Sequence, residues 1–154
     1  MSVIESKLQA MGLSLPKISS PVANYVPIVR HENLLFLSGH IPRDENGSPL
    51  KGQVGKDYST EQAYNIAKQV TLSLLATIKS EVGDLDRIDR IIKLVCLVNA
   101  PSDYTDHPAV ANGGSDLLVE AFGDIGRHSR VAAGAGSLPG GTPVEIELTA
   151  SISP

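Results

Sequence analysis

The sequence predicts a single α+β domain in which two helices cover one face of a sheet, with the elements in the order β-β-α-β-α-β-β. Three observations favour this class. A long stretch with helical spacing, residues 59–82, separates shorter runs that are rich in β-branched residues. The last run, residues 144–152, alternates apolar and polar residues with a period of two. The chain has 154 residues, of which 42% are hydrophobic and 19% charged, and this is enough to bury one core.

The first half of the chain predicts a short helix and a hairpin before the long helix. Residues 2–11 have a loosely helical period that ends at a glycine. The runs YVPIVR and LLFLSGHI, on either side of HEN, are typical of a hairpin, and Pro27 makes its first strand an edge or an irregular one. In the long helix, Ser59 and Gln62 match a capping box, and Gly83 is placed as a terminating residue.

The second half predicts a central strand, a second helix and two further strands. Residues 90–98, RIIKLVCLV, are apolar on both faces. Pro108 can open the second helix, although Gly113 and Gly114 weaken its early turns. SRVAAGA and VEIELTASI are predicted strands, and SLPGGTP is a turn-rich connection between them. Because residues 34–37 are also apolar on both faces, something must cover the second face of the sheet, and a small domain commonly achieves this by oligomerising.

Charge and cysteine content argue against several classes of function. The net charge of −4 and the lack of a Lys/Arg cluster argue against a nucleic-acid partner. No apolar run approaches the roughly 20 residues that span a bilayer, and the first residues do not resemble a secretory signal, so we expect a cytoplasmic location and no membrane partner. The single cysteine, Cys96, lies in an apolar run and is expected to be a buried structural thiol. No metal-ligand spacing or phosphate-binding loop is present, so neither a metal site nor a nucleotide site is expected.

The stretch RHSRVAAGAGSLPGGTPVEIE, residues 127–147, carries two candidate site residues on what we expect to be neighbouring extended segments. Small residues follow Arg130, so its guanidinium would project from a low surface, which suits bidentate recognition of a carboxylate. The alternative is that Arg130 pairs with Glu145 or Glu147 on an exposed strand face. Glu145 could equally be solvated or orient a water molecule in a cleft. The residues alone leave both alternatives open.

Two further side chains are weaker candidates. An ordinary surface or hydrogen-bonded role is favoured for each of the four histidines, and His40 keeps some interest because it follows the strand end Ser38-Gly39. Tyr25, just before the first strand, is most simply a packing residue whose hydroxyl reaches the surface.

With these residues in view, the sequence resembles the RidA/YjgF family, also named the L-PSP endoribonuclease family, in its longer branch with an N-terminal extension, here residues 1–20. NYVPIVRHENLLFLSGHIP, the helix and strand pattern of residues 61–98, and RVAAGAGSLPGGTPVEIELTASI together cover most of residues 24–152. The resemblance implies one domain over residues 1–154 with a chorismate-mutase-like fold. It also implies a homotrimeric barrel with the sheets inward and ligand sites in clefts between subunits.

The family's deaminase members hydrolyse reactive enamine/imine intermediates to 2-keto acids and ammonia, with no metal or organic cofactor. The resemblance therefore implies a deaminase acting on a small-molecule carboxylate, in which Arg130 binds the carboxylate and Glu145 orients the attacking water. The other site residues that it implies are Tyr25, Ser38, Gly39 and His40, with either Asn112 or Asp116 from the second helix.

Two other functions stay open beside the deaminase. The same cleft could serve a non-catalytic binder of small carboxylic metabolites. Some family names carry an endoribonuclease or translation-inhibitor activity, against which the acidic charge balance counts. The chain also departs from the deaminase pattern, because His40 stands where those members often carry Gln, and His128-Ser129 replaces the Pro-Ala that often precedes the arginine.

Overall fold

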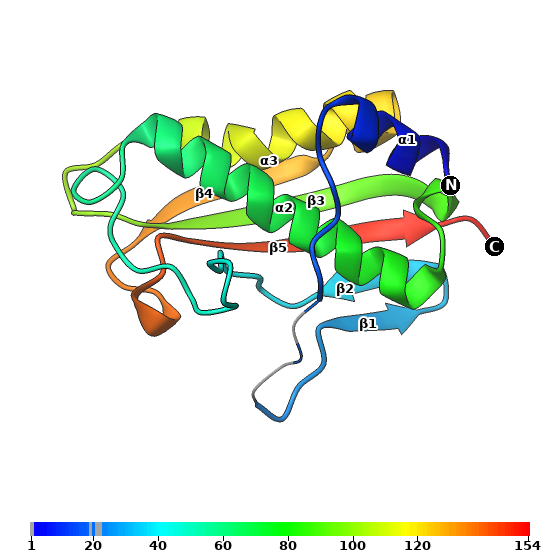
Figure 1. Ribbon diagram of the computed structural model, residues 1–154, viewed down its shortest axis with the longest axis horizontal. Helices are drawn as coiled ribbons and strands as arrows, with labels where there is room; N and C mark the ends of the chain where they lie inside the picture. Colours follow the sequence, from blue (N-terminus) through cyan, green and yellow to red (C-terminus); the bar gives the residue numbers. More distant parts are fainter. Residues whose placement is uncertain (1, 19, 21–22) are drawn as a thin grey trace.

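The computed structural model describes residues 2–18, 20 and 23–154, so residues 1 and 19 of the expected N-terminal extension lie outside the described residues. The helices and strands (Figure 1) are α1 (Val3–Ala10), β1 (Ile28–His31), β2 (Leu34–Leu37), α2 (Thr60–Val82), β3 (Ile88–Asn99), α3 (His107–Phe122), β4 (Ser129–Ala135) and β5 (Val144–Ile152). The predicted order β-β-α-β-α-β-β is confirmed, with α1 in front of it. Within the described residues, no helix is both long and apolar enough to cross a membrane.

The five strands form one sheet in the order β1-β2-β5-β3-β4. All neighbours are antiparallel except β3 and β4, which α3 connects as a parallel pair. The expectation that the strands carrying Arg130 and Glu145 are neighbours is wrong, because β3 lies between β4 and β5. The physical reason is that β3 and β5, the longest strands with 12 and 9 residues, pair with each other along most of their length, and the return through α3 places β4 on the other side of β3.

Both long helices have the ends that the sequence predicts. Ser59 and Gln62 exchange side-chain and backbone hydrogen bonds in a capping box at the start of α2, and Gly83 ends that helix with φ of 83°. Pro108 lies in the first turn of α3. Gly113 and Gly114 lie inside α3 without breaking it. They are needed there because a Cβ at Gly113 would collide with the backbone oxygen of Tyr64 on α2.

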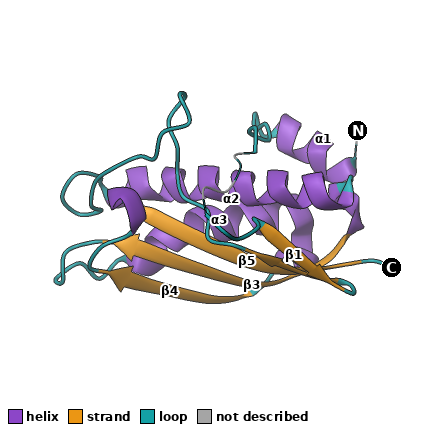
Figure 2. Cartoon of the chain, turned by 90° about the horizontal axis from the view of Figure 1, so that it is seen from below, coloured by secondary structure: helices purple, strands orange, loops and turns teal. Residues whose placement is uncertain are grey.

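The helices cover one face of the sheet, and the core lies between the two layers (Figure 2). From β5, the residues that point into the core are Val144, Ile146, Leu148, Ala150 and Ile152, as the alternation predicts. Cys96 on β3 points the same way and is fully buried. Burial raises the pKa of its thiol to about 12, so the expected structural role of Cys96 is confirmed.

The other face of the sheet is open in the single chain. Register places the open-face residues in rows: Ala133–Leu97–Glu145, then Val131–Val95–Glu147, then Ser129–Lys93–Thr149–Phe36–Val29. Val29, Phe36 and Val131 on this face are 50%, 45% and 44% exposed. Apolar side chains on both faces of β2 thus leave one face without a cover, and the covering partner stays a prediction.

Helix α1 is held on the helix layer by defined contacts. Ser2 caps it by accepting from the backbone N–H of Glu5. The Asp86 carboxylate accepts from the backbone N–H groups of Val3 and Ile4 at 2.8 and 2.9 Å. Glu5 pairs with Lys79 of α2 at 2.8 Å. The predicted helix over residues 2–11 is thus confirmed and packs as part of the domain.

Candidate functional site

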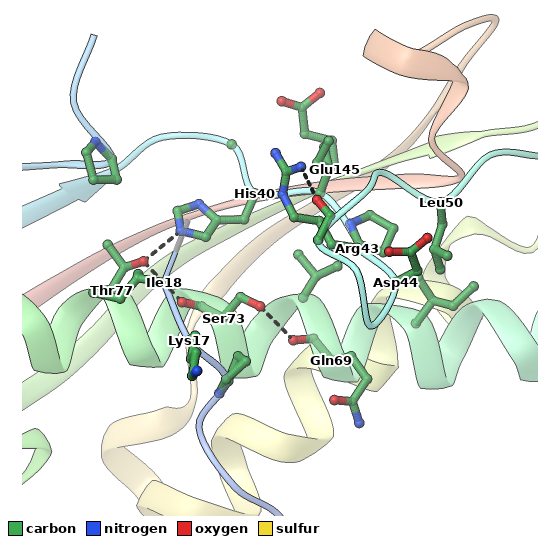
Figure 3. Close-up of a pocket in the computed structure, with 18 of the residues that line it drawn as sticks. Lys17, Ile18, His40, Arg43, Asp44, Leu50, Gln69, Ser73, Thr77 and Glu145 are labelled. Atoms are coloured by element: carbon green, nitrogen blue, oxygen red, sulfur yellow. Dashed lines mark hydrogen bonds between the residues drawn. The ribbon is translucent and has the colours of Figure 1, made fainter. Parts of the chain in front are cut away.

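A cavity of about 960 Å³ lies between α2 and the segment that follows β2. Figure 3 shows this cavity, with α2 as its floor. Five of the predicted site residues line it: Tyr25, Ser38, Gly39, His40 and Glu145. The structure thus brings together every predicted site residue except Arg130 and the helix residue that accompanies it.

Glu145 lies at the edge of the cavity, with its carboxylate on the side of the sheet away from α2 (Figure 3). It packs so closely on Gly39 that a Cβ there would collide with its carboxylate oxygen. Partial burial, and then the charge of Glu147, raise the pKa of Glu145. Within the described residues no group hydrogen-bonds to its carboxylate. Glu145 is therefore a half-buried carboxylate, free to bind a water molecule and a better proton acceptor than an ordinary glutamate.

His40 forms a wall of the cavity, with both ring nitrogens occupied. Nδ1 lies 2.8 Å from the Ser38 carbonyl oxygen, and Nε2 lies 2.8 Å from the Thr77 hydroxyl of α2 (Figure 3). Burial is the main cause that lowers the pKa of His40; the Ser38 carbonyl opposes it and the charge of Arg43 adds to it. In a neutral ring that donates from Nδ1 to the Ser38 carbonyl, Nε2 is an acceptor for the Thr77 hydroxyl, whose proton is also within reach of the Ser73 carbonyl oxygen at 3.1 Å. His40 is thus a fixed neutral side chain, and neither ring nitrogen is left for a ligand.

Tyr25 and Ser38 shape the entrance of the cavity. The Ser38 hydroxyl donates to the Val26 carbonyl oxygen at 2.7 Å and fixes the segment before β1. Tyr25 is 52% exposed, so its expected role as a packing residue is wrong. The reason is that β1 starts only at Ile28, after Pro27, and the tyrosine stands in the preceding turn at the rim of the cavity.

Arg130 lies elsewhere, on edge strand β4, and reaches α3. Its Nη1 donates to Asn112 Oδ1 at 2.7 Å and to Ser115 Oγ at 3.2 Å. Asp116 accepts instead from the Tyr64 hydroxyl of α2 at 2.8 Å, so of the two open choices Asn112 is the one beside the arginine. Within the described residues, Nε and Nη2 of Arg130 make no hydrogen bond. These two donors form the edge that binds a carboxylate with two parallel hydrogen bonds.

The sheet separates Arg130 from Glu145. Arg130 shares a row with Leu94 and Leu148 on the helix face, whereas Glu145 shares a row with Leu97 on the open face. With about 4.8 Å between strands and about 3.3 Å per residue, their Cα atoms lie about 14 Å apart. The alternative in which Arg130 pairs with Glu145 or Glu147 is therefore wrong, because side chains on opposite faces of a sheet cannot meet.

Three polar residues near these groups escape the sequence analysis: Thr77, Ser115 and His128. Ser115 Oγ lies 2.9 Å from His128 Nε2. Two signals could have found this pair. Ser115 is three residues after Asn112, on the same side of α3, and His128 is two residues before Arg130, in step with its alternation. Within the described residues, no group of His, Cys, Asp and Glu side chains is arranged to hold a metal ion.

Comparison with known proteins gives relatives along the whole chain. Residues 5–150 match the family described as YjgF/chorismate_mutase-like, putative endoribonuclease. Protein TCP17 of Trypanosoma cruzi is 35% identical over 159 residues, which cover 99% of each chain.

Two solved structures share both sequence and fold with the chain. A protein of unknown function from Agrobacterium tumefaciens is 36% identical, with a TM-score of 0.90 over 98% of this chain and 93% of that one. A putative endoribonuclease from Shewanella oneidensis MR-1 is 34% identical, with a TM-score of 0.93 over 98% of this chain and all 100% of that one.

Proposed function

Since the chain belongs to the YjgF/chorismate-mutase-like family, as the sequence predicts, and has that family's fold, we propose that it is a hydrolytic deaminase of small enamine/imine carboxylates. The observation that carries the proposal is the state of Arg130. Its Nη1 is held by Asn112 and Ser115, while the Nε and Nη2 edge has no hydrogen-bond partner within the described residues. That edge matches the two oxygens of a carboxylate.

Glu145 supplies the second half of the chemistry. Water adds to the imine carbon, and Glu145 accepts a proton from that water as the new C–O bond forms. Glu145 returns that proton to the nitrogen, which gives a carbinolamine. The hydroxyl proton of the carbinolamine then also moves to the nitrogen as the C=O bond forms and the C–N bond breaks, and ammonia and a 2-keto acid leave. An enamine enters the same route after protonation of its carbon gives the imine. Because an imine is intrinsically reactive, positioning of substrate and water accounts for much of the rate enhancement.

The two halves need a second copy of the chain. Arg130 and Glu145 lie on opposite faces of one sheet, so one subunit does not present both to one ligand. The uncovered sheet face, with Val29, Phe36 and Val131 exposed, gives a second copy a surface to bury. We propose the homotrimer that the resemblance implies, with Arg130 of one subunit facing the Glu145 cavity of its neighbour. Light scattering that finds a monomer at micromolar concentration would contradict this assembly.

Ammonia release tests the activity. Freshly generated 2-aminoacrylate or 2-iminobutanoate is the substrate, and the wild type is compared with Arg130→Ala and Glu145→Gln. After the spontaneous rate is subtracted, we expect the kcat/KM of each variant to be at least 100-fold below that of the wild type, because each substitution removes one half of the site. Ser80→Ala, at an exposed position of α2 outside the residues that line the cavity, is the control. Equal rates for the wild type and Arg130→Ala would refute the deaminase.

A non-catalytic binder of small carboxylic metabolites is a second candidate, and the state of His40 favours it. Both ring nitrogens of His40 are occupied within the protein, at the position where the deaminases often carry Gln. The residue at this position thus has no free polar group to offer the substrate. A binder would take up a 2-keto acid at Arg130 and release no ammonia above the spontaneous rate.

The description of the family and the name of the Shewanella protein also suggest an endoribonuclease, which we do not favour for this chain. Cleavage of RNA needs phosphate binding, which is driven by clustered cations, whereas this chain has 17 Asp and Glu against 13 Lys and Arg. RNA cleavage that falls steeply with added salt and is lost in Arg130→Ala would restore the ribonuclease as the better function.

A further inference from the structure

Ser115 and His128 stand behind the guanidinium of Arg130, outside the residues that would touch a ligand. Ser115 Oγ is 3.2 Å from Arg130 Nη1 and 2.9 Å from His128 Nε2. His128 Nδ1 is in turn 2.7 Å from the carbonyl oxygen of Gly126, in the short turn η2 (Gly123–Gly126) before β4. A continuous chain of hydrogen bonds therefore connects a backbone carbonyl to the guanidinium.

The chemistry of each group fixes the direction of these hydrogen bonds. The Gly126 carbonyl oxygen can only accept, so Nδ1 of His128 carries the proton and donates. In a neutral ring Nε2 is then an acceptor, and the one hydroxyl proton of Ser115 points to it. The lone pairs of Ser115 Oγ are left for Arg130, which can only donate. Through His128, the turn before β4 thus orients the Ser115 hydroxyl so that its lone pairs, and not its proton, face Arg130.

Two contacts on Nη1 hold the guanidinium in one plane. Asn112 is exposed, and a hydrogen bond to its side chain by itself would let the flat guanidinium turn about that one contact. Ser115, three residues along α3 and half-buried, adds a second contact to the same nitrogen. The Nε and Nη2 edge then points in one direction without loss of rotamer freedom when a ligand binds.

We propose that Ser115 and His128 are positioning residues that fix the carboxylate-binding edge of Arg130 and so set the preference of the site for carboxylates over neutral analogues. The proposal rests on the proposed role of Arg130 as carboxylate anchor. A pair that only stabilised the fold would affect charged and neutral ligands alike. A pair that orients the two donors on one edge of the guanidinium affects mainly the affinity for a carboxylate, which has two oxygens that match these donors.

Calorimetry on the full-length assembly tests this with two probes, 2-oxobutanoate and its neutral analogue 2-oxobutanamide. Ser115→Ala is expected to raise the Kd of 2-oxobutanoate about tenfold, the effect of one hydrogen bond to a charged group, and to leave that of the amide nearly unchanged. His128→Ala is expected to raise it several-fold, and His128→Gln to restore it, because the Gln side-chain oxygen can accept the Ser115 hydroxyl. Ser80→Ala, at an exposed position of α2, is the control.

The outcomes separate this proposal from the proposed function. Wild-type binding that is lost in Arg130→Ala but kept at full strength in both Ser115→Ala and His128→Ala would overturn the positioning role alone. An equal rise in the Kd of 2-oxobutanoate and of 2-oxobutanamide in these two variants would also overturn the positioning role. A wild type that binds 2-oxobutanoate no better than Arg130→Ala would overturn the anchor and the positioning role together.

Two readouts need no binding measurement. Nitrogen-15 spectra of the histidine rings in alkaline buffer are expected to show His128 protonated at Nδ1, and an Nε2–H tautomer would overturn the directions argued above. A hydroxyl beside an oriented imidazole is also the arrangement of an activated serine. Covalent labelling of Ser115 by a fluorophosphonate, absent in His128→Ala, would replace the positioning role with a nucleophilic one.

Discussion

Individual side chains of the site differ in how freely they can act. Glu145 has a polar neighbour in Glu147 and a backbone neighbour in Gly39, but no hydrogen bond within the described residues holds its carboxylate. Arg130 is held through one nitrogen and open through two others. His40 is occupied at both nitrogens. Of these three residues, only Glu145 and Arg130 have unused hydrogen-bonding groups for a ligand, and the proposed chemistry therefore relies on them.

His40 gives the fold a pH dependence of known sign. Burial lowers its pKa from 6.5 in the folded chain, so below that pH the unfolded chain binds more protons than the folded one. The contribution of His40 to the free energy of unfolding is therefore fully present above the pKa that this residue has in the unfolded chain. It is lost as the pH falls below that pKa. We expect the Tm of the wild type to fall more steeply than that of His40→Gln between about pH 7 and 5.

The comparison of slopes isolates His40 from the other titrating groups, because those are common to both proteins. Gln can still donate to the Ser38 carbonyl or accept from Thr77, so the variant is expected to fold. Parallel Tm curves over this range would show that the ring is protonated as easily in the folded chain as in the unfolded one.

Helices α2 and α3 pack with their backbones close together, and two glycines of α3 permit it. A Cβ at Gly113 would overlap the Tyr64 backbone oxygen, and one at Gly114 would lie 2.6 Å from the Thr71 hydroxyl. Glycine in a helix interior costs about 0.5–1 kcal/mol relative to alanine. The contact between backbones must be worth more than this, since neither helix can withdraw without opening the core beneath both.

Gly113→Ala is expected to lower the free energy of unfolding by about 1–2 kcal/mol, because overpacking at about 1–3 kcal/mol outweighs the gain in helix propensity. Urea unfolding followed by circular dichroism measures it. Gly136→Ala is the matched control, since a Cβ there meets nothing within 4 Å and its φ is not in the left-handed region. A stabilised Gly113→Ala would mean that propensity exceeds packing at this contact.

The elements themselves could be predicted from local patterns, but their neighbours in the sheet could not. Capping residues, the position of Pro108 and the alternation in residues 144–152 define α2, α3 and β5 from a few adjacent residues. The position of β3 between β4 and β5 depends on contacts between distant segments. The alternation therefore shows that Glu145 faces away from the core, but not that Arg130 faces the other way.

The same limit explains the site. Arg130, Glu145, Gly39 and the strand end before His40 could be identified from residue type and from the resemblance. The partners of Arg130 could not, because Asn112 and Ser115 on α3 meet it only when the helix has packed on β4. Side chains that touch no ligand leave no chemical motif of their own in the sequence.

For the whole molecule, the proposed assembly predicts that two inactive proteins restore each other. Arg130→Ala subunits keep Glu145, and Glu145→Gln subunits keep Arg130. If equal amounts are unfolded, mixed and refolded into closed trimers, each boundary receives both intact halves with a probability of about one quarter. We expect about a quarter of the wild-type rate of ammonia release in the mixture, and none in either parent alone.

Light scattering on the same samples confirms that all three preparations have the same mass. A mixture as inactive as its parents, at that same mass, would show that both residues of each site come from one chain. A mixture with activity above a quarter would point to preferential pairing between unlike subunits.

In the proposed trimer, the sheet that separates Arg130 from Glu145 would also make the activity depend on the concentration of the protein. A folded subunit outside the proposed trimer would present Arg130 and Glu145 on opposite faces of its sheet and would complete no site. The proposed activity per subunit would then be constant while the chains are associated. It would disappear on dilution below the dissociation constant of the assembly, although every chain stays folded. A cell that makes too little of this protein would lose the function before it loses the protein.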